Sequence, residues 1–286
     1  MDARRVRLGI SPCPNDTFAF HGLLTGAVRP RGIELSIELL DIEALNAGFE
    51  AGRFDAAKVS FAAALAWGAS SVVLRAGSAL GFGVGPLLVA RPDAPPLAAR
   101  DPRARVLCPG ARTTAHLLYR LFHGEAGQVE HTLFSAILPA LERGAADYGV
   151  CIHEGRFTYA RRGLVLVEDL GATWEARTGA PLPLGGIVAR RELGPATLAA
   201  LDAALRASLD LARAEPDAAL ATMRAHAAEL DDAVIRAHVD LYVNAWTRDL
   251  GPQGAAALAA LSHAARAAGL LPDYLPELAV APEGPP

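Results

Sequence analysis

The sequence predicts an α/β protein made of two lobes with a ligand cleft between them. Short apolar runs alternate with helical stretches over the first two thirds of the 286 residues, as expected for a mostly parallel sheet covered by helices. Two proline- and glycine-rich segments, near 91–101 and 178–186, interrupt this alternation. From Pro195 onward nearly every stretch has helical periodicity.

The elements follow in a regular order. Apolar or alternating runs bounded by turn residues predict strands at 6–10, 33–39, 56–60, 72–75, 86–90, 106–108, 148–152, 164–167 and 187–190. Helical spacing predicts helices at 18–24, 41–51, 61–67, 113–123, 135–144, 195–214, 217–228, 231–246 and 253–269. The last residues, 279–286, are expected to form a loose tail.

The two interruptions predict how the chain is divided between the lobes. Residues 1–95 and 186–286 are expected to form lobe one, which includes the C-terminal helices, and residues 96–185 to form lobe two. A chain that leaves one lobe, builds a second and returns has the periplasmic-binding-protein-like (type II) architecture. In that architecture the ligand binds in the cleft between the lobes.

A short internal echo supports this division. In each half a helix ends at a glycine, an aspartate follows three residues later, and an apolar strand leads to a polar residue. These polar residues are Ser60 in one half and His153 in the other. Open α/β sheets present ligand groups at the carboxyl ends of strands, so both are expected to face the cleft. So short a match also has chance as an alternative explanation.

Composition excludes several classes of function. Hydrophobic residues make up 52% of the chain and charged residues 20%, which is enough for a buried core. The net charge is −4 and the basic residues are scattered, so nucleic acid is not an expected partner. Three widely spaced cysteines favour neither a disulfide framework nor a metal site. No run reaches the roughly 18 apolar residues of a membrane span and no secretory signal is recognisable, so we expect a cytoplasmic protein.

Two strand–turn–helix junctions are candidate anion sites. The first is 11–17, where Asn15 and Thr17 can add side-chain hydrogen bonds to the free amides of a helix start. The second follows Gly110, where Thr113 and Thr114 open a helix. Simple helix capping explains the same residues equally well at both places.

His153 is the candidate catalyst, because an imidazole accepts a proton near neutral pH and this one follows a buried strand. A structural histidine is the alternative. Lys58, two residues before Ser60, is a candidate for holding a substrate carboxylate or donating a proton, with a surface lysine as the alternative.

The segment Ser11–Phe18 reads SPCPNDTF and resembles the N-terminal signature of 1,4-dihydroxy-6-naphthoate synthases of menaquinone biosynthesis. The resemblance continues in the family's order through nearly the whole chain, in the blocks 58–63, 83–87, 112–115, 152–159, 181–185 and 238–244.

The resemblance implies a carbon–carbon lyase without a cofactor that converts cyclic dehypoxanthinylfutalosine to 1,4-dihydroxy-6-naphthoate. It implies that His153 is the general base and that Lys58, Val59, Ser60, Thr113 and Thr114 hold the substrate. Two other functions remain open: chorismate dehydratase of the same pathway, and a non-catalytic binding protein for a small carboxylate. The oligomeric state is not indicated.

Overall fold

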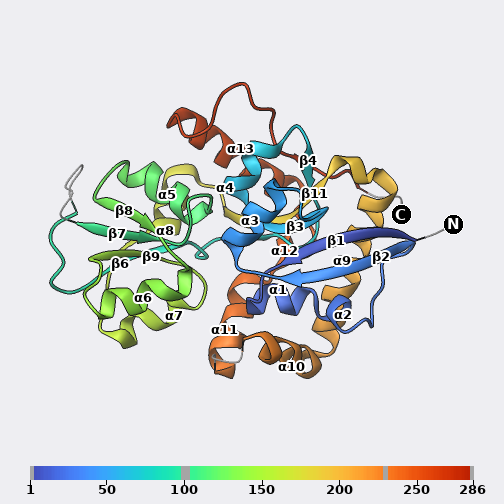
Figure 1. Ribbon diagram of the computed structural model, residues 1–286, viewed down its shortest axis with the longest axis horizontal. Helices are drawn as coiled ribbons and strands as arrows, with labels where there is room; N and C mark the ends of the chain where they lie inside the picture. Colours follow the sequence, from blue (N-terminus) through green and yellow to red (C-terminus); the bar gives the residue numbers. More distant parts are fainter. Residues whose placement is uncertain (1–2, 98–103, 228–230, 284–286) are drawn as a thin grey trace.

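The computed structural model describes residues 3–97, 104–227 and 231–283. They form two lobes that lie side by side along the long axis of the molecule, each built around its own sheet (Figure 1). Both ends of the described chain lie on the larger lobe (Figure 1).

The sheet of lobe one has seven strands. In spatial order they are β12 (Ala279–Val280), β4 (Ser71–Val73), β11 (Leu182–Arg190), β3 (Ala56–Ser60), β1 (Arg4–Ile10) and β2 (Ile33–Leu39), with β5 (Ala79–Gly81) also paired to β11. β1 is parallel to β2 and β3, but β11 is antiparallel to β3, β4 and β5. The expected mostly parallel sheet is therefore mixed, because β11 enters from the second lobe, against the direction of β3.

The sheet of lobe two has five strands. In spatial order they are β10 (Val165–Asp169), β6 (Leu87–Ala90), β9 (Tyr148–Cys151), β7 (Arg105–Cys108) and β8 (Gln128–His131). β7 is parallel to β8 and β9, whereas β6 is antiparallel to β9 and β10. This sheet is mixed for the same reason, since β6 arrives from the other lobe.

The position of β6 indicates that the chain first passes between the lobes earlier than expected. We expected the passage near 91–101, but the strands on both sides of that segment belong to the second sheet. Part of the segment, 98–103, lies outside the described residues. We therefore propose that the first passage runs through 82–86, between β5 and β6. The return joins lobe two to β11 inside the expected 178–186.

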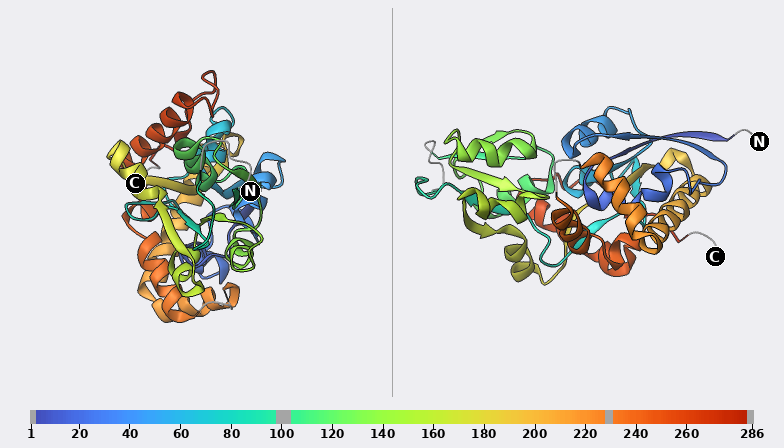
Figure 2. Two further views of the ribbon diagram at one scale, coloured as in Figure 1. Left: turned by 90° about the vertical axis from the view of Figure 1, so that its left-hand side faces the viewer. Right: turned by 90° about the horizontal axis from the view of Figure 1, so that it is seen from below.

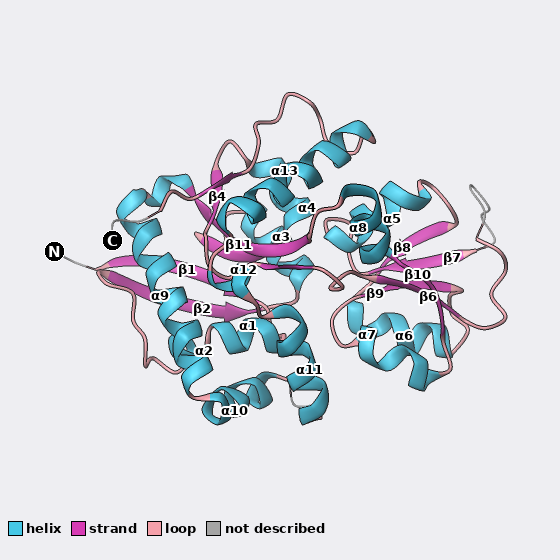
Figure 3. Ribbon diagram, turned by 180° about the vertical axis from the view of Figure 1, so that it is seen from behind, coloured by secondary structure: helices cyan, strands magenta, loops and turns pink. Residues whose placement is uncertain are grey.

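Helices cover both sheets (Figures 2 and 3). Lobe one carries α1 (Pro14–Ala19), α2 (His21–Leu24), α3 (Ile42–Glu50), α4 (Phe61–Ala64), α9 (Pro195–Ala214), α10 (Pro216–His226), α11 (Asp232–Tyr242), α12 (Ala245–Arg248) and α13 (Gly251–Ala267). Lobe two carries α5 (Thr114–His123), α6 (Phe134–Glu142), α7 (Gly155–Thr158) and α8 (Leu170–Thr178).

Most predicted elements occur where expected, and β2, β3 and α9 have the predicted limits. The helix expected over 231–246 is divided, because Asn244 caps a new helix after α11 ends. The loose tail expected from residue 279 begins instead with β12, which pairs with β4. One hydrophobic cluster runs through both lobes and includes Val59 and Val188 of the first sheet and Val106 and Val150 of the second.

Candidate active site

A cavity lies between the lobes, where strands of both sheets end. It is lined by Ser11, Asn15, Asp16, Ile42, Lys58, Ser60, Ala79, Leu184, Gly185 and Tyr242 of lobe one, by Val84 and Pro86 between β5 and β6, and by Thr113, Thr114, Ala115, Ile152 and His153 of lobe two. Of the candidate residues from the sequence, all except Val59 and Thr17 line this cavity. Polar side chains line it from both lobes, although most of its accessible surface is apolar.

A buried ion pair forms part of the cavity wall. The Lys58 Nζ donates to Asp16 Oδ1 at 2.6 Å and to the carbonyl oxygen of Gly77 at 3.0 Å. Ser11 donates its hydroxyl to the other Asp16 oxygen at 2.6 Å. Lys58 and Asp16 are both almost fully buried. Asp16 is not among the site residues expected from the sequence. Its role as the partner of Lys58 depends on β3 lying beside β1.

Asn15 connects this pair to a histidine on α11. Its amide nitrogen donates to Asp16 Oδ1 at 2.9 Å, so its carbonyl oxygen faces His238. That oxygen lies 2.9 Å from His238 Nε2, which must therefore carry the proton. Burial lowers the pKa of His238 well below its usual value, with His153 and Lys58 adding to the effect. His238 is thus held neutral in a single tautomer.

His153 faces the cavity from the end of β9. Its φ of 54° makes it the one non-glycine residue in the left-handed region among those described. Its ring meets Phe134 edge-on at 4.9 Å and lies nearly parallel to His238 at 6.0 Å between centroids. Its Nε2 is 3.8 Å from the sulfur of Cys13. Strained backbone of this kind is maintained only where surrounding contacts require it, and it occurs often at functional sites.

The pKa of His153 is lowered to about 4. Burial is the main cause, the negative charge of Asp16 opposes it, and the positive charge of Lys58 adds to it. The imidazole is therefore neutral at physiological pH and has a lone pair available to accept a proton. Burial also raises the pKa of the neighbouring Cys13, so that thiol stays protonated.

Strand β3 presents Lys58 and Ser60 to the cavity because alternate side chains of a strand point the same way. Val59 points the opposite way and is fully buried in the hydrophobic core. Its side chain is therefore not available to a ligand, contrary to expectation. Asn46 orients Ser60 by accepting from its backbone amide at 2.9 Å and donating to its hydroxyl oxygen at 3.3 Å.

Thr113 and Thr114 lie at the N-terminus of α5, but their hydroxyl protons are already used. Thr113 donates to the carbonyl of Gly110 at 2.9 Å and caps the helix by accepting from His116 N. Thr114 donates to the carbonyl of Leu184 at 2.7 Å, across the cleft. The groups left for an anion are the first backbone amides of α5, which have no intrahelical partner.

The other expected anion site, at the start of α1, is not supported. Pro14 has no N–H, and the amides of Asp16 and Thr17 both donate to the carbonyl of Cys13. The buried carboxylate of Asp16 would also repel an anion. Thr17 is fully buried, and its hydroxyl donates to the Cys13 carbonyl at 3.1 Å, so it stabilises the helix start. Asn15 remains on the cavity wall.

Tyr242 lies within the block 238–244 and is not among the site residues expected from the sequence. The residue is 6% exposed and lines the cavity, and its ring packs on His238 with 4.6 Å between the ring centroids. Among the described residues no group of three or more metal-binding side chains is clustered. No helix in that part of the chain is long and apolar enough to cross a membrane.

Comparison with known proteins identifies relatives over almost the whole chain. A family model described as menaquinone biosynthesis matches residues 6–267. A 1,4-dihydroxy-6-naphthoate synthase of Thermus thermophilus is 49% identical over 265 residues, which is 93% of this chain and 95% of the relative. The enzyme of the same name from Streptomyces coelicolor is 41% identical over 283 residues, 97% of this chain and 98% of the relative.

Solved structures agree on the fold. A protein of Archaeoglobus fulgidus has a TM-score of 0.85 at 32% identity, covering 93% of this chain and 98% of that one. The alkanesulfonate-binding protein of Xanthomonas axonopodis has a TM-score of 0.71 at 14% identity, covering 96% of each chain, which indicates a shared fold alone. The predicted two-lobed architecture is therefore confirmed. The chain belongs to the menaquinone-biosynthesis family.

Proposed function

We propose that this chain is a carbon–carbon lyase that converts cyclic dehypoxanthinylfutalosine to 1,4-dihydroxy-6-naphthoate, the product for which its two curated relatives are named. The observation that carries the proposal is His153, a neutral imidazole in a strained backbone conformation that faces a cavity between the lobes. A base that is neutral at physiological pH can remove a proton from carbon next to a carbonyl group.

The substrate's carboxylate is expected to bind at the N-terminus of α5. Thr114 and Ala115 open this ten-residue helix and line the cavity, and the helix dipole favours negative charge there. Ser60 lies beside this point, since Gly185 pairs with Ser60 and Thr114 bonds to Leu184. The Ser60 hydroxyl accepts from Asn46 and keeps its own proton for a carboxylate oxygen.

The reaction begins when His153 takes a proton from the carbon next to the substrate carbonyl. The electron pair of the broken C–H bond moves into the new carbon–carbon double bond, and the carbonyl oxygen gains negative charge. Opening of the ring and loss of a small carbonyl fragment follow. Lys58 has a third N–H beyond those given to Asp16 and Gly77, and it can bind a substrate oxygen. The apolar walls keep water from competing with these contacts.

The test is direct. Purified protein is incubated with cyclic dehypoxanthinylfutalosine, without added metal or nucleotide, and dihydroxynaphthoate is measured by absorbance and mass. We expect product from the wild type and from His263→Ala, a change on an exposed face of α13. We expect binding without turnover from His153→Ala. Equal turnover by His153→Ala would remove His153 as the base.

Other results would lead to the alternatives. Tight binding of the substrate without product would favour a binding protein. If the protein neither binds nor converts this substrate, the chorismate dehydratase alternative is favoured. It is tested by incubating the protein with chorismate and measuring the loss of water. In either case the lyase proposal would be wrong.

A further inference from the structure

We propose that Tyr242 is a second catalytic residue, whose hydroxyl donates a hydrogen bond to the substrate carbonyl oxygen as that oxygen gains negative charge. The inference rests on the proposed function, because it concerns the same proton abstraction by His153. The bond stays a hydrogen bond throughout: the proton remains on the phenol, and the electron pair released at carbon is held on the carbonyl oxygen.

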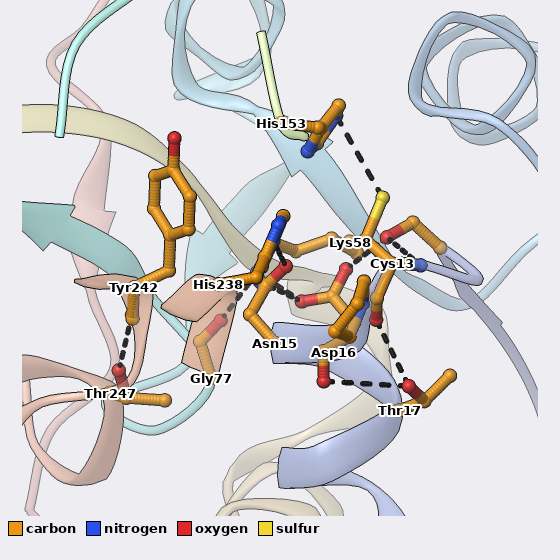
Figure 4. A network of polar contacts seen from close by, with 12 residues as sticks. Cys13, Asn15, Asp16, Thr17, Lys58, Gly77, His153, His238, Tyr242 and Thr247 are labelled. Carbon is orange, nitrogen blue, oxygen red and sulfur yellow. Dashed lines mark hydrogen bonds and ion pairs between the residues drawn. The ribbon is translucent and has the colours of Figure 1, made fainter. Parts of the chain in front are cut away.

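The hydroxyl of Tyr242 is available. Tyr242 is the last residue of α11 and is more than nine-tenths buried, yet it lines the cavity. No described residue hydrogen-bonds its hydroxyl, although its backbone carbonyl accepts from Thr247 at 3.2 Å. Figure 4 shows the phenol oxygen directed away from α11 and joined to nothing else in the network. Because Tyr242 lines the cavity, this hydroxyl can donate to a ligand oxygen there.

Most other hydroxyl protons in the cavity are already committed. Ser11 donates to Asp16, Thr113 to the Gly110 carbonyl and Thr114 to the Leu184 carbonyl. These groups can accept from a substrate but cannot stabilise an oxyanion. Of the cavity hydroxyls, those of Ser60 and Tyr242 keep a free proton. Ser60 lies beside the N-terminus of α5, at the carboxylate end, so Tyr242 is the hydroxyl left for the other oxygen, with the third N–H of Lys58 as a further donor in the cavity.

Tyr242 is also held in place. Its ring packs on His238 at 4.6 Å with an interplanar angle of 48°. His238 is fixed by Asn15, and Asn15 by Asp16. A donor that needs no rearrangement during the reaction stabilises a transition state better than a mobile one.

Tyr242 and the base His153 line the same cavity, and the ring of each lies near that of His238. His153 lies nearly parallel to His238 on one side, and Tyr242 packs on the same ring. A carbon that loses a proton and the neighbouring carbonyl oxygen are separated by only two bonds, so the two groups must act close together. Burial raises the pKa of Tyr242, with Arg156 opposing the rise, so the phenol remains a donor across the working pH range.

The experiment compares Tyr242→Phe with Tyr274→Phe. Both changes delete one phenol oxygen, but Tyr274 is 85% exposed and serves as the matched control. We expect kcat of Tyr242→Phe on cyclic dehypoxanthinylfutalosine to fall about 100- to 1,000-fold, as for removal of one oxyanion donor, with KM changed only a few-fold. Tyr274→Phe should match the wild type.

Two further measurements separate this role from a structural one. Tyr242→Phe should keep the thermal unfolding midpoint and the acid limb of the kcat/KM profile of the wild type, which shows that the fold and His153 are intact. If the wild type is active and Tyr242→Phe has the same kcat, the proposed role of Tyr242 is wrong but the proposed function stands. A wild type that makes no product from this substrate would overturn the proposed function and this inference with it.

Discussion

Replacing Asp16 by Asn tests whether the ion pair with Lys58 is a structural requirement of the cavity. Three donors converge on the two Asp16 oxygens, namely the hydroxyl of Ser11, the ammonium of Lys58 and the amide of Asn15. Asn offers a single acceptor oxygen and one NH2 group, which must face one of these donors. The change also leaves the buried charge of Lys58 without a counter-ion.

The expected cost follows from these contacts. A buried donor that loses its acceptor costs about 1–3 kcal/mol, and removing one partner of a buried ion pair costs about 3–5 kcal/mol. The two effects overlap at this site, so we expect a loss of about 3–5 kcal/mol for Asp16→Asn. The double variant Asp16→Asn with Lys58→Met removes the charge as well and should recover at least about 2 kcal/mol of that loss.

Denaturant unfolding at equilibrium gives the free energy of unfolding for the wild type, both single variants and the double variant. Glu34→Gln is the control, because it makes the same acid-to-amide change in a solvent-exposed pair with Arg5 and should have little measurable effect. A loss below about 1 kcal/mol for Asp16→Asn, or no recovery in the double variant, would refute the reasoning.

Three further predictions concern His153 and the first passage between lobes. Because burial lowers the pKa of His153 to about 4, kcat/KM should fall only as the pH drops toward 4. The folded state should also lose stability between pH 6.5 and 4, because the unfolded state takes up the proton in that range and the folded state does not. A pH–rate profile with an acid limb near 6.5 would contradict this. His153→Gly should be about 1 kcal/mol more stable than His153→Ala in thermal unfolding, because φ is 54° there, and equal stabilities would exclude backbone strain. A Cβ at Gly85 would lie 2.2 Å from the Cα of Gly171, so Gly85→Ala should lower the free energy of unfolding by at least about 3 kcal/mol. Gly83 has a positive φ but open space around a Cβ, so Gly83→Ala should lower it by only about 1 kcal/mol. Similar losses for the two variants would argue against the close contact at Gly85.

Much of the cavity was predictable from the sequence because it depends on local signals. The periodicity of β3 is enough to expect that Lys58 and Ser60 share a face. A Thr113–Thr114 pair after a strand and Gly110 is enough to expect a helix start there. His153 stands out as a polar residue at the end of an apolar strand. These signals involve only neighbours in the chain, and most elements formed where they predicted.

The partners of these residues could not be predicted in the same way. Asp16 meets Lys58, and Asn15 meets His238 from 223 positions away, only because separate elements pack together. The direction of β11 and the assignment of β6 to lobe two depend on how the chain passes between lobes, and no local pattern encodes this.

The sequence by itself determined the fold class, the family, and the candidate base His153, because these follow from periodicity and from motifs that are contiguous in the chain. The tertiary structure alone decided the state of each group. In the folded chain the side chain of Val59 points into the core, and the hydroxyls of Thr113 and Thr114 donate to backbone carbonyls. The hydroxyl of Tyr242 keeps a proton that it can donate. The reason is physical: burial and hydrogen-bond partners determine protonation and donor capacity, and both are set by residues distant in sequence.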